Sequence, residues 1–173
     1  MRRGLLIVFT GNGKGKTTAA LGMALRGAGH AMKIRILQFI KGAMKYGELT
    51  SLTHLDGVSI EPLGSGFTWQ KESLDEDREL ARLGWEKARR EILHGDYDLI
   101  VLDELCYVLS YGLLRLDLVL ETLRNRPPHL HVVVTGRNAP DDLIREADCA
   151  TEMRVIKHHY VDQGIKAQQG IEF

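Results

Sequence analysis

The segment that most limits the possible folds is TGNGKGKTTAA, Thr10–Ala20, which directly follows the apolar run Leu5–Phe9. A buried strand, a glycine-rich loop and a helix in this order form a phosphate-binding loop, whose usual pattern is G-x-x-x-x-G-K-[ST]. The residues Gly15–Thr17 match the end of that pattern. The first glycine is missing, because Thr10 occupies its position and Gly11 comes one residue later. The sequence therefore predicts a phosphate loop that departs from the usual pattern but lies, as expected, between a strand and a helix.

The chemistry of phosphate binding does not need the missing glycine. Backbone N–H groups and the positive end of the following helix can still point at an anion. Lys16 and Lys14 add positive charge, and the Thr17 hydroxyl is placed to bind Mg²⁺. Three glycines allow the unusual backbone angles and the close approach that such a loop needs: Gly11, Gly13 and Gly15. We therefore predict phosphate binding rather than a purely structural turn.

Apolar runs recur along the rest of the chain, separated by helical or loop segments. Near-continuous runs of Val, Ile and Leu are typical of strands buried on both faces of a parallel sheet. The expected strands are Leu5–Phe9, Ile34–Phe39, Val58–Pro62, Leu99–Leu102, Leu130–Thr135 and, more weakly, Thr151–Ile156. The expected helices are Thr17–Gly29, Leu74–His94 and a segment that begins at Leu116 and stops at two prolines. This alternation predicts one α/β domain over residues 1–173, with a mostly parallel, doubly wound sheet like that of phosphate-loop (RecA-like) NTPases.

The charge and composition exclude several classes of function. Lys plus Arg and Asp plus Glu each number 23, so the formal net charge is zero and a nucleic-acid or membrane-surface partner is not expected. No apolar run approaches the length of a membrane span, and the apolar run after Met1 leads into glycines rather than a cleavage site. Cys106 and Cys149 form no CxxC pair, and the histidines lack zinc-type spacing. We expect a cytoplasmic protein without a zinc site.

A second candidate element is the run DLIVLDE, Asp98–Glu104. It reads as an apolar strand that ends in two adjacent carboxylates, Asp103 and Glu104. In a phosphate-loop fold, the end of such a strand brings carboxylates to the magnesium ion. In a hydrolytic ATPase, Glu104 would instead activate water. The sequence does not divide these roles between the two residues.

Six blocks in the same order resemble the phosphate-loop type of ATP:corrinoid adenosyltransferases. The blocks are FTGNGKGKTTAA (residues 9–20), QFIKG (38–42), GFTW (66–69), VLDELCY (101–107), VVVTGR (132–137) and IKAQQGIE (165–172). They extend over nearly the whole chain, and the missing first glycine of the loop is itself a trait of that family. Six ordered blocks are far more specific than one phosphate loop.

The resemblance implies a particular reaction. The 5′-deoxyadenosyl group of ATP would be transferred to the Co(I) of a corrinoid, and the whole triphosphate would leave. The loop would then hold a leaving group, with no phosphoryl transfer and no attacking water. The family binds ATP in the direction opposite to that of ordinary phosphate-loop hydrolases, so that the ribose C5′ faces the cobalt.

The resemblance also implies roles for residues at matching positions. Lys16 would neutralise charge on the α-phosphate oxygen as the C–O bond breaks, and Arg137 would lie near the nucleotide and brace phosphate or ribose. Phe67 and Trp69 would face the corrinoid and help to displace its lower axial ligand. The metal would be held by Thr17 and Glu104, with Asp103 alongside. The nucleotide-binding set would be Gly11, Asn12, Gly13, Lys14, Gly15, Lys16, Thr17 and Thr18 in the loop, with Arg26 on the following helix.

ATP as co-substrate and Mg²⁺ follow from the same resemblance, as do the expected partners. These are a corrinoid (cobalamin, cobinamide or cobyrinic acid diamide), a reduced flavoprotein as electron donor, and a second copy of the chain in a homodimer. Family members often carry a segment before the first strand, whereas only Met1, Arg2 and Arg3 precede the glycine and apolar run here. Two alternatives remain open from the residues alone, a RecA-like ATPase that uses Glu104 to activate water and a nucleotide-dependent binding module.

Overall fold

The computed structural model describes residues 3–42, 46–64 and 75–173. In this part of the chain, six parallel strands form one sheet with the order β3-β2-β4-β5-β1-β6. The strands are β1 (Leu6–Thr10), β2 (Ile34–Gln38), β3 (Val58–Pro62), β4 (Leu99–Asp103), β5 (His131–Thr135) and β6 (Cys149–Glu152). Because β5 lies between β1 and β4, it separates the strand of the glycine-rich loop from the strand of the two carboxylates.

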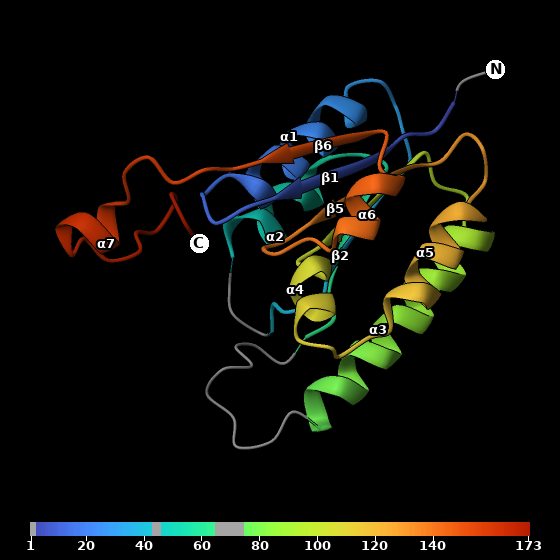
Figure 1. Ribbon diagram of the computed structural model, residues 1–173. Helices are drawn as coiled ribbons and strands as arrows, with labels where there is room; N and C mark the ends of the chain where they lie inside the picture. Colours follow the sequence, from blue (N-terminus) through green and yellow to red (C-terminus); the bar gives the residue numbers. More distant parts are fainter. Residues whose placement is uncertain (1–2, 43–45, 65–74) are drawn as a thin grey trace.

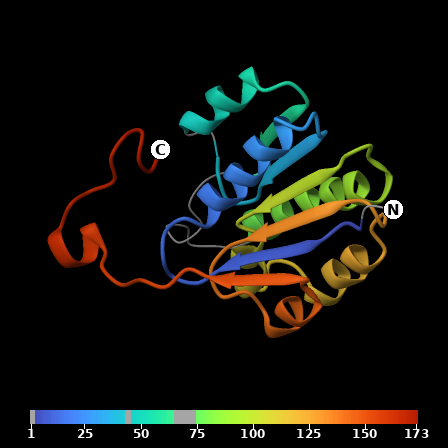
Figure 2. The ribbon, with the colours of Figure 1, turned by 90° about the horizontal axis from the view of Figure 1, so that it is seen from above.

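Helices cover both faces of this sheet (Figures 1 and 2). The described residues form the helices α1 (Lys16–Ala28), α2 (Gly47–Ser51), α3 (Asp75–His94), α4 (Leu105–Ser110), α5 (Leu116–Arg124), α6 (Asp141–Glu146) and α7 (His159–Gln163), and a 3₁₀ turn spans Leu52–His54. The predicted fold class, a doubly wound parallel α/β sheet of the phosphate-loop NTPase kind, is confirmed. None of the helices in the described ranges is long and apolar enough to cross a bilayer.

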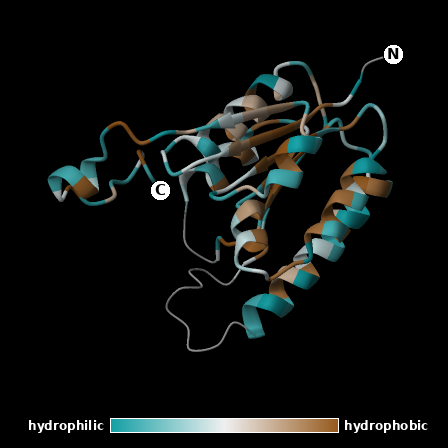
Figure 3. Ribbon diagram, in the orientation of Figure 1, coloured by the Kyte–Doolittle hydropathy of each residue, from teal (hydrophilic) through white to brown (hydrophobic). Residues whose placement is uncertain are grey.

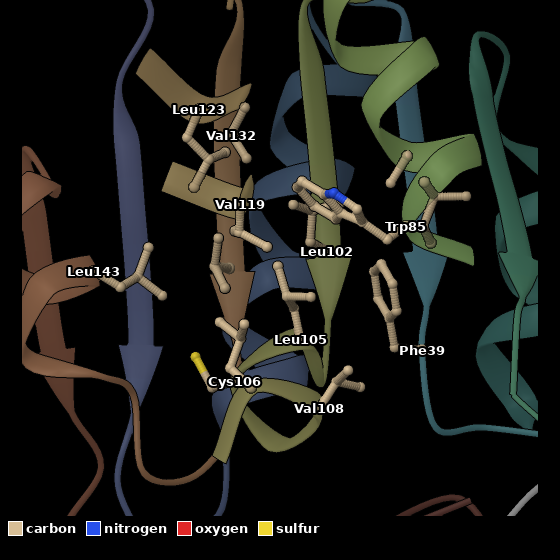
Figure 4. Packing of buried hydrophobic residues seen from close by; sticks show 14 of the residues in the cluster. Phe39, Trp85, Leu102, Leu105, Cys106, Val108, Val119, Leu123, Val132 and Leu143 are labelled. Atoms are coloured by element: carbon tan, nitrogen blue, oxygen red, sulfur yellow. The ribbon is translucent and has the colours of Figure 1, made fainter. Parts of the chain in front are cut away.

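Alternate residues of the central strands enter two separate cores. On one face, Ile100 and Leu102 of β4 pack in a cluster with α3, α4 and α5 (Figure 4). On the other face, Leu99 and Val101 of the same strand pack in a cluster with α1. This period of two is expected for a strand covered on both sides, and it explains why β4 reads as an unbroken apolar run. The long helix α3 is coloured as a mixture of hydrophobic and hydrophilic residues, as an amphipathic surface helix requires (Figure 3).

The predicted position of the last strand differs from the observed one. The apolar pattern placed it at Thr151–Ile156, whereas β6 covers Cys149–Glu152. The physical reason is that β6 is an edge strand that pairs only with β1, and all four of its residues are exposed. Apolar burial therefore does not mark its position, and Val155 and Ile156 follow it as exposed side chains.

The parallel direction of the strands brings their carboxyl ends to one edge of the sheet. Polar residues occupy the last positions there: Thr10, Gln38, Asp103, Thr135 and Glu152. After β6, residues 153–173 leave this edge, and α7 stands apart from the sheet (Figures 1 and 2). The candidate site lies along this edge, between the loop after β1 and the turn after β4.

Candidate active site

In the glycine-rich loop between β1 and α1, two of the three glycines have the unusual backbone angles that the sequence predicts, and Gly13 does not. Gly11 and Gly15 have positive φ angles of 95° and 106°, and Gly15 is the residue immediately before α1. The left-handed region is easily reached only by glycine. The N–H groups at the start of α1 therefore remain directed at the loop, where an anion would be stabilised.

Gly11 and Gly13 are also favoured by a close backbone contact that the sequence did not reveal. A Cβ atom at Gly11 or at Gly13 would lie 2.6 Å from the carbonyl oxygen of Met153, the residue that follows β6. The Gly13 N–H donates a hydrogen bond of 2.6 Å to that same oxygen. The loop is thus held against the end of β6 as well as being shaped for a ligand.

Lys16 folds across the loop and is 8% exposed. Its ammonium donates hydrogen bonds to the carbonyl oxygens of Gly11 (2.8 Å) and Gly13 (2.7 Å). Burial lowers the pKa of Lys16, and the nearby Glu104 carboxylate opposes that effect. A cation held in this position is close to any phosphate that the loop binds.

Asp103 is almost completely buried at the end of β4 and receives hydrogen bonds from three side chains. Its Oδ1 accepts from the hydroxyls of Thr17 (2.8 Å) and Thr135 (2.7 Å). Its Oδ2 accepts from Nε2 of Gln38 at 3.0 Å, and the Lys41 ammonium lies 3.8 Å away. Because the Thr17 hydroxyl gives its proton to Asp103, its lone pairs are free to face a metal ion.

Glu104 adopts a left-handed backbone conformation, φ 61° and ψ 19°, immediately before α4. Its N–H donates a hydrogen bond of 2.9 Å to the Thr135 hydroxyl. Burial raises the pKa of its carboxyl, as does the neighbouring Asp103, whereas Lys16, Lys41 and Arg137 act in the opposite direction. Glu104 is therefore a partly buried carboxylate surrounded by cations, and unlike Asp103 it lies at a bend of the chain.

The two arginines singled out from the sequence lie in different places. Arg137 is exposed just after β5, and its charge acts on both Lys16 and Glu104. Arg26 is exposed in the last turn of α1, ten residues after Lys16. At 1.5 Å per residue, its backbone is about 15 Å along the helix from the loop. The contact of Arg26 with a nucleotide stays a prediction.

The remaining loop residues are more accessible, and two of the expected side chains cannot be placed. Asn12 and Thr18 are exposed, and Lys14 is half-exposed with its ammonium 2.7 Å from Oε2 of Glu172. Beside the loop, a pocket of about 400 Å³ opens between the ends of β1 and β6. Phe67 and Trp69 lie outside the described residues.

Sequence reasoning did not assign roles to Gln38, Thr135, Lys41 or Glu172, all of which lie next to the predicted residues. Gln38 and Thr135 end their strands at the carboxyl edge, so their position in the apolar runs could have identified them. Glu172 reaches Lys14 from the far end of the chain. No signal in the spacing of the residues indicates that contact.

Comparisons with known proteins identify the family of the chain. The family described as ATP:corrinoid adenosyltransferase BtuR/CobO/CobP matches residues 2–173. The chain belongs to this family. Corrinoid adenosyltransferases from Escherichia coli K12 and Pseudomonas aeruginosa are 42% and 45% identical to it. The alignments cover 99% of this chain and 86% and 84% of those relatives.

A solved structure shows the same fold at much lower similarity. The flagellar accessory protein FlaH from Methanocaldococcus jannaschii superposes with a TM-score of 0.61 at 12% identity, over 88% of this chain and 72% of that one. At this identity the likeness shows the fold alone. The resemblance seen in the six sequence blocks is confirmed by the family match, and the chain is accordingly an enzyme of the ATP:corrinoid adenosyltransferase family.

Proposed function

We propose that the chain transfers the 5′-deoxyadenosyl group of ATP to the Co(I) of a corrinoid and releases triphosphate, in cobalamin synthesis or salvage. The observation that carries the proposal is the family match over residues 2–173. It is supported by a site that combines a phosphate loop, a buried lysine and two carboxylates at one edge of the sheet. One domain formed by residues 1–173 would hold both substrates.

The proposed reaction is a substitution at the ribose C5′. The electron pair of Co(I) forms the Co–C5′ bond, while the bond from C5′ to the α-phosphate oxygen breaks and its electron pair leaves with triphosphate. Negative charge therefore grows on the leaving oxygen. The buried Lys16 ammonium and the N–H groups at the start of α1 are suited to stabilise that charge, because a preorganised cation in a site of low polarity acts strongly.

The described residues fit a magnesium ion. Mg²⁺ prefers oxygen ligands, and the Thr17 hydroxyl and the Glu104 carboxylate supply them next to the loop. When bound, the ion would neutralise phosphate charge. We propose that Glu104 and Thr17 hold the ion, and that Asp103 orients the Thr17 hydroxyl, because Asp103 already accepts three hydrogen bonds.

Further residues would bind the nucleotide, and the enzyme would need two partners. Lys14, Asn12, Thr18 and Arg137 would contact ATP, with Arg26 contributing from α1. A reduced flavoprotein would supply electrons, and a second copy of the chain would form a homodimer. The exposed apolar side chains of the last 21 residues support a partner there: Val155, Ile156, Tyr160, Val161, Ile165, Ile171 and Phe173.

The deciding experiment incubates the protein with ATP, Mg²⁺ and chemically reduced cobalamin or cobinamide. The proposal expects the light-sensitive spectrum of a cobalt–carbon bond and one triphosphate for each corrinoid alkylated. A hydrolytic ATPase that uses Glu104 to activate water would release ADP and phosphate instead. Release of ADP without an alkylated corrinoid would refute the adenosyl transfer, and no product at all would favour a binding module.

Trp69 provides a test of the corrinoid side of the reaction. We expect Trp69→Ala to slow the reaction about tenfold when it starts from Co(II) with a mild reductant, because loss of aromatic contact impairs removal of the lower axial ligand. The reaction with preformed Co(I) should change little, since this cobalt state needs no electron. Rates from both starting states, measured by the appearance of the cobalt–carbon spectrum, check this. Equal losses from both states would contradict the proposed role.

Glu172 provides a test of the loop. Its carboxylate holds the Lys14 ammonium at 2.7 Å, and this ion pair lowers the pKa of Glu172. Because phosphate must compete for the same ammonium, we expect Glu172→Gln to lower the KM for ATP roughly two- to fivefold, the range for a partly exposed ion pair. Glu146→Gln, which removes the partner of Arg124, is the matched control and should leave KM unchanged. A higher KM in Glu172→Gln would mean that the pair helps ATP binding.

A further inference from the structure

Thr135 touches both acidic residues of the site through one hydroxyl. It is the last residue of β5 and is fully buried. Its Oγ1 donates to Oδ1 of Asp103 at 2.7 Å and accepts from the N–H of Glu104 at 2.9 Å. A threonine hydroxyl has one proton, so donation to Asp103 turns its lone pairs toward Glu104. Both hydrogen bonds thus depend on the same atom.

The hydrogen bond from Glu104 to Thr135 is made by a residue whose backbone conformation is unfavourable. Glu104 has a positive φ of 61°, which costs free energy for a residue with a Cβ atom. Such conformations persist when surrounding contacts fix them, and they gather at functional sites. The N–H of Glu104 precedes the first turn of α4, where helical N–H groups lack partners within the helix. The Thr135 hydroxyl supplies that partner.

Gly136 brings the end of β5 close enough to α4 for this contact. A Cβ atom at Gly136 would lie 2.8 Å from the Cβ of Cys106 and 3.0 Å from the N of Tyr107. The φ of Gly136 is 135°, which also favours glycine. The end of β5 therefore packs directly against the first turn of α4. Any shift between the two elements would separate Thr135 from Glu104.

We propose that Thr135 is a positioning residue that holds Asp103 and Glu104 in their relative orientation for metal and nucleotide. Asp103 in turn fixes the Thr17 hydroxyl through its Oδ1, the same oxygen that Thr135 contacts. Thr135 thereby connects the turn after β4 with the phosphate loop, although its own side chain is fully buried. The kinetic part of this inference rests on the proposed adenosyl transfer, whereas its structural part does not.

The test compares Thr135→Val, which keeps the shape and removes the hydroxyl, with Thr135→Ser, which keeps the hydroxyl. Thr122→Val is the matched control, because Thr122 is also buried and its hydroxyl donates to a helix carbonyl, that of Leu118. The first measurement is hydrogen exchange of the Glu104 amide by NMR in the protein without ligands. We expect exchange about fivefold to tenfold faster in Thr135→Val, the effect of losing one hydrogen bond, and near wild type in the other two variants.

The second measurement is the apparent affinity for Mn²⁺ in the presence of ATP, from the electron paramagnetic resonance signal of free Mn²⁺. Loss of a residue that orients metal ligands typically costs about 10- to 100-fold in affinity or activity, so we expect this loss in Thr135→Val. Serine should restore the affinity and kcat. Melting temperatures of all three variants show whether each is folded.

Wild-type exchange and Mn²⁺ affinity in a folded Thr135→Val would overturn the inference. Equal losses in Thr135→Val and Thr122→Val would also overturn it, because they would reflect general destabilisation. If Thr135→Val does not fold, Thr135→Ser decides: wild-type exchange and affinity support the role of the hydroxyl, and impaired values refute it. If the wild-type protein alkylates no corrinoid, the proposed function fails while exchange and Mn²⁺ binding still report on Thr135.

Discussion

Replacing Lys16 with methionine is expected to reduce kcat by about 100- to 1,000-fold, the cost of removing one preorganised donor to a developing anion. In the structure, the ammonium lies between the Gly11 and Gly13 carbonyl oxygens and is largely excluded from water. Burial already lowers the pKa of Lys16, so its charge is costly in the absence of phosphate. Methionine has a similar length and no charge, and the fold should survive the change.

Lys14→Met is the matched control, because both lysines belong to the same loop. The Lys14 side chain is 49% exposed and paired with Glu172, so solvent screens its charge. We expect a fall in kcat of less than about tenfold, with the main change in the KM for ATP. Rates with preformed Co(I) and melting temperatures measure both variants. Similar kcat values in Lys16→Met and Lys14→Met would show that Lys16 has no special role in the transition state.

The central part of the fold could be predicted because its signals are local. The strand, the glycine-rich loop and the helix around Lys16 are contiguous in the sequence. A central strand such as β4 can be recognised by its unbroken run of apolar residues, because both of its faces are buried. The edge strand β6 has no such signal, because all four of its residues are exposed. Its register is set by pairing with β1, which lies more than 130 residues earlier in the chain.

The roles of Asp103 and Glu104 could not be separated from sequence because they depend on distant partners. The contacts of Asp103 with Gln38 and Thr135 join residues that are 65 and 32 positions away. The left-handed backbone conformation of Glu104 belongs to the turn between β4 and α4, and no residue type in the run DLIVLDE predicts it. The distance of Arg26 from the loop likewise follows from its place in the last turn of α1. The residue types and their order in the sequence predict candidate site residues, whereas the order of the strands and the backbone angles of the turns determine how those residues are arranged.

Glu104 provides the sharpest test of this geometry, because function and stability should change in opposite directions. A buried carboxylate is costly, and here burial, followed by the charge of Asp103, raises the pKa of Glu104. A carboxyl whose pKa is higher in the folded state favours folding at acidic pH, and that contribution is lost as the pH rises through the folded value. At neutral pH the ionised Glu104 therefore lowers the free energy of unfolding. Glu104→Gln removes that cost.

We therefore expect Glu104→Gln to melt a few degrees above the wild type at neutral pH, with an advantage that shrinks as the pH falls below the raised pKa of Glu104. The same variant should lose about 100-fold or more in kcat, because a neutral amide is a poor replacement for the carboxylate that we propose as a metal ligand. Thermal unfolding at several pH values and turnover with preformed Co(I) measure the two effects. A variant that melts lower at neutral pH would show that cations such as Lys16 and Arg137 outweigh burial. A difference independent of pH would show that folding does not shift the pKa of Glu104. A stable but inactive variant would place Glu104 among the residues whose unfavourable setting is retained for function.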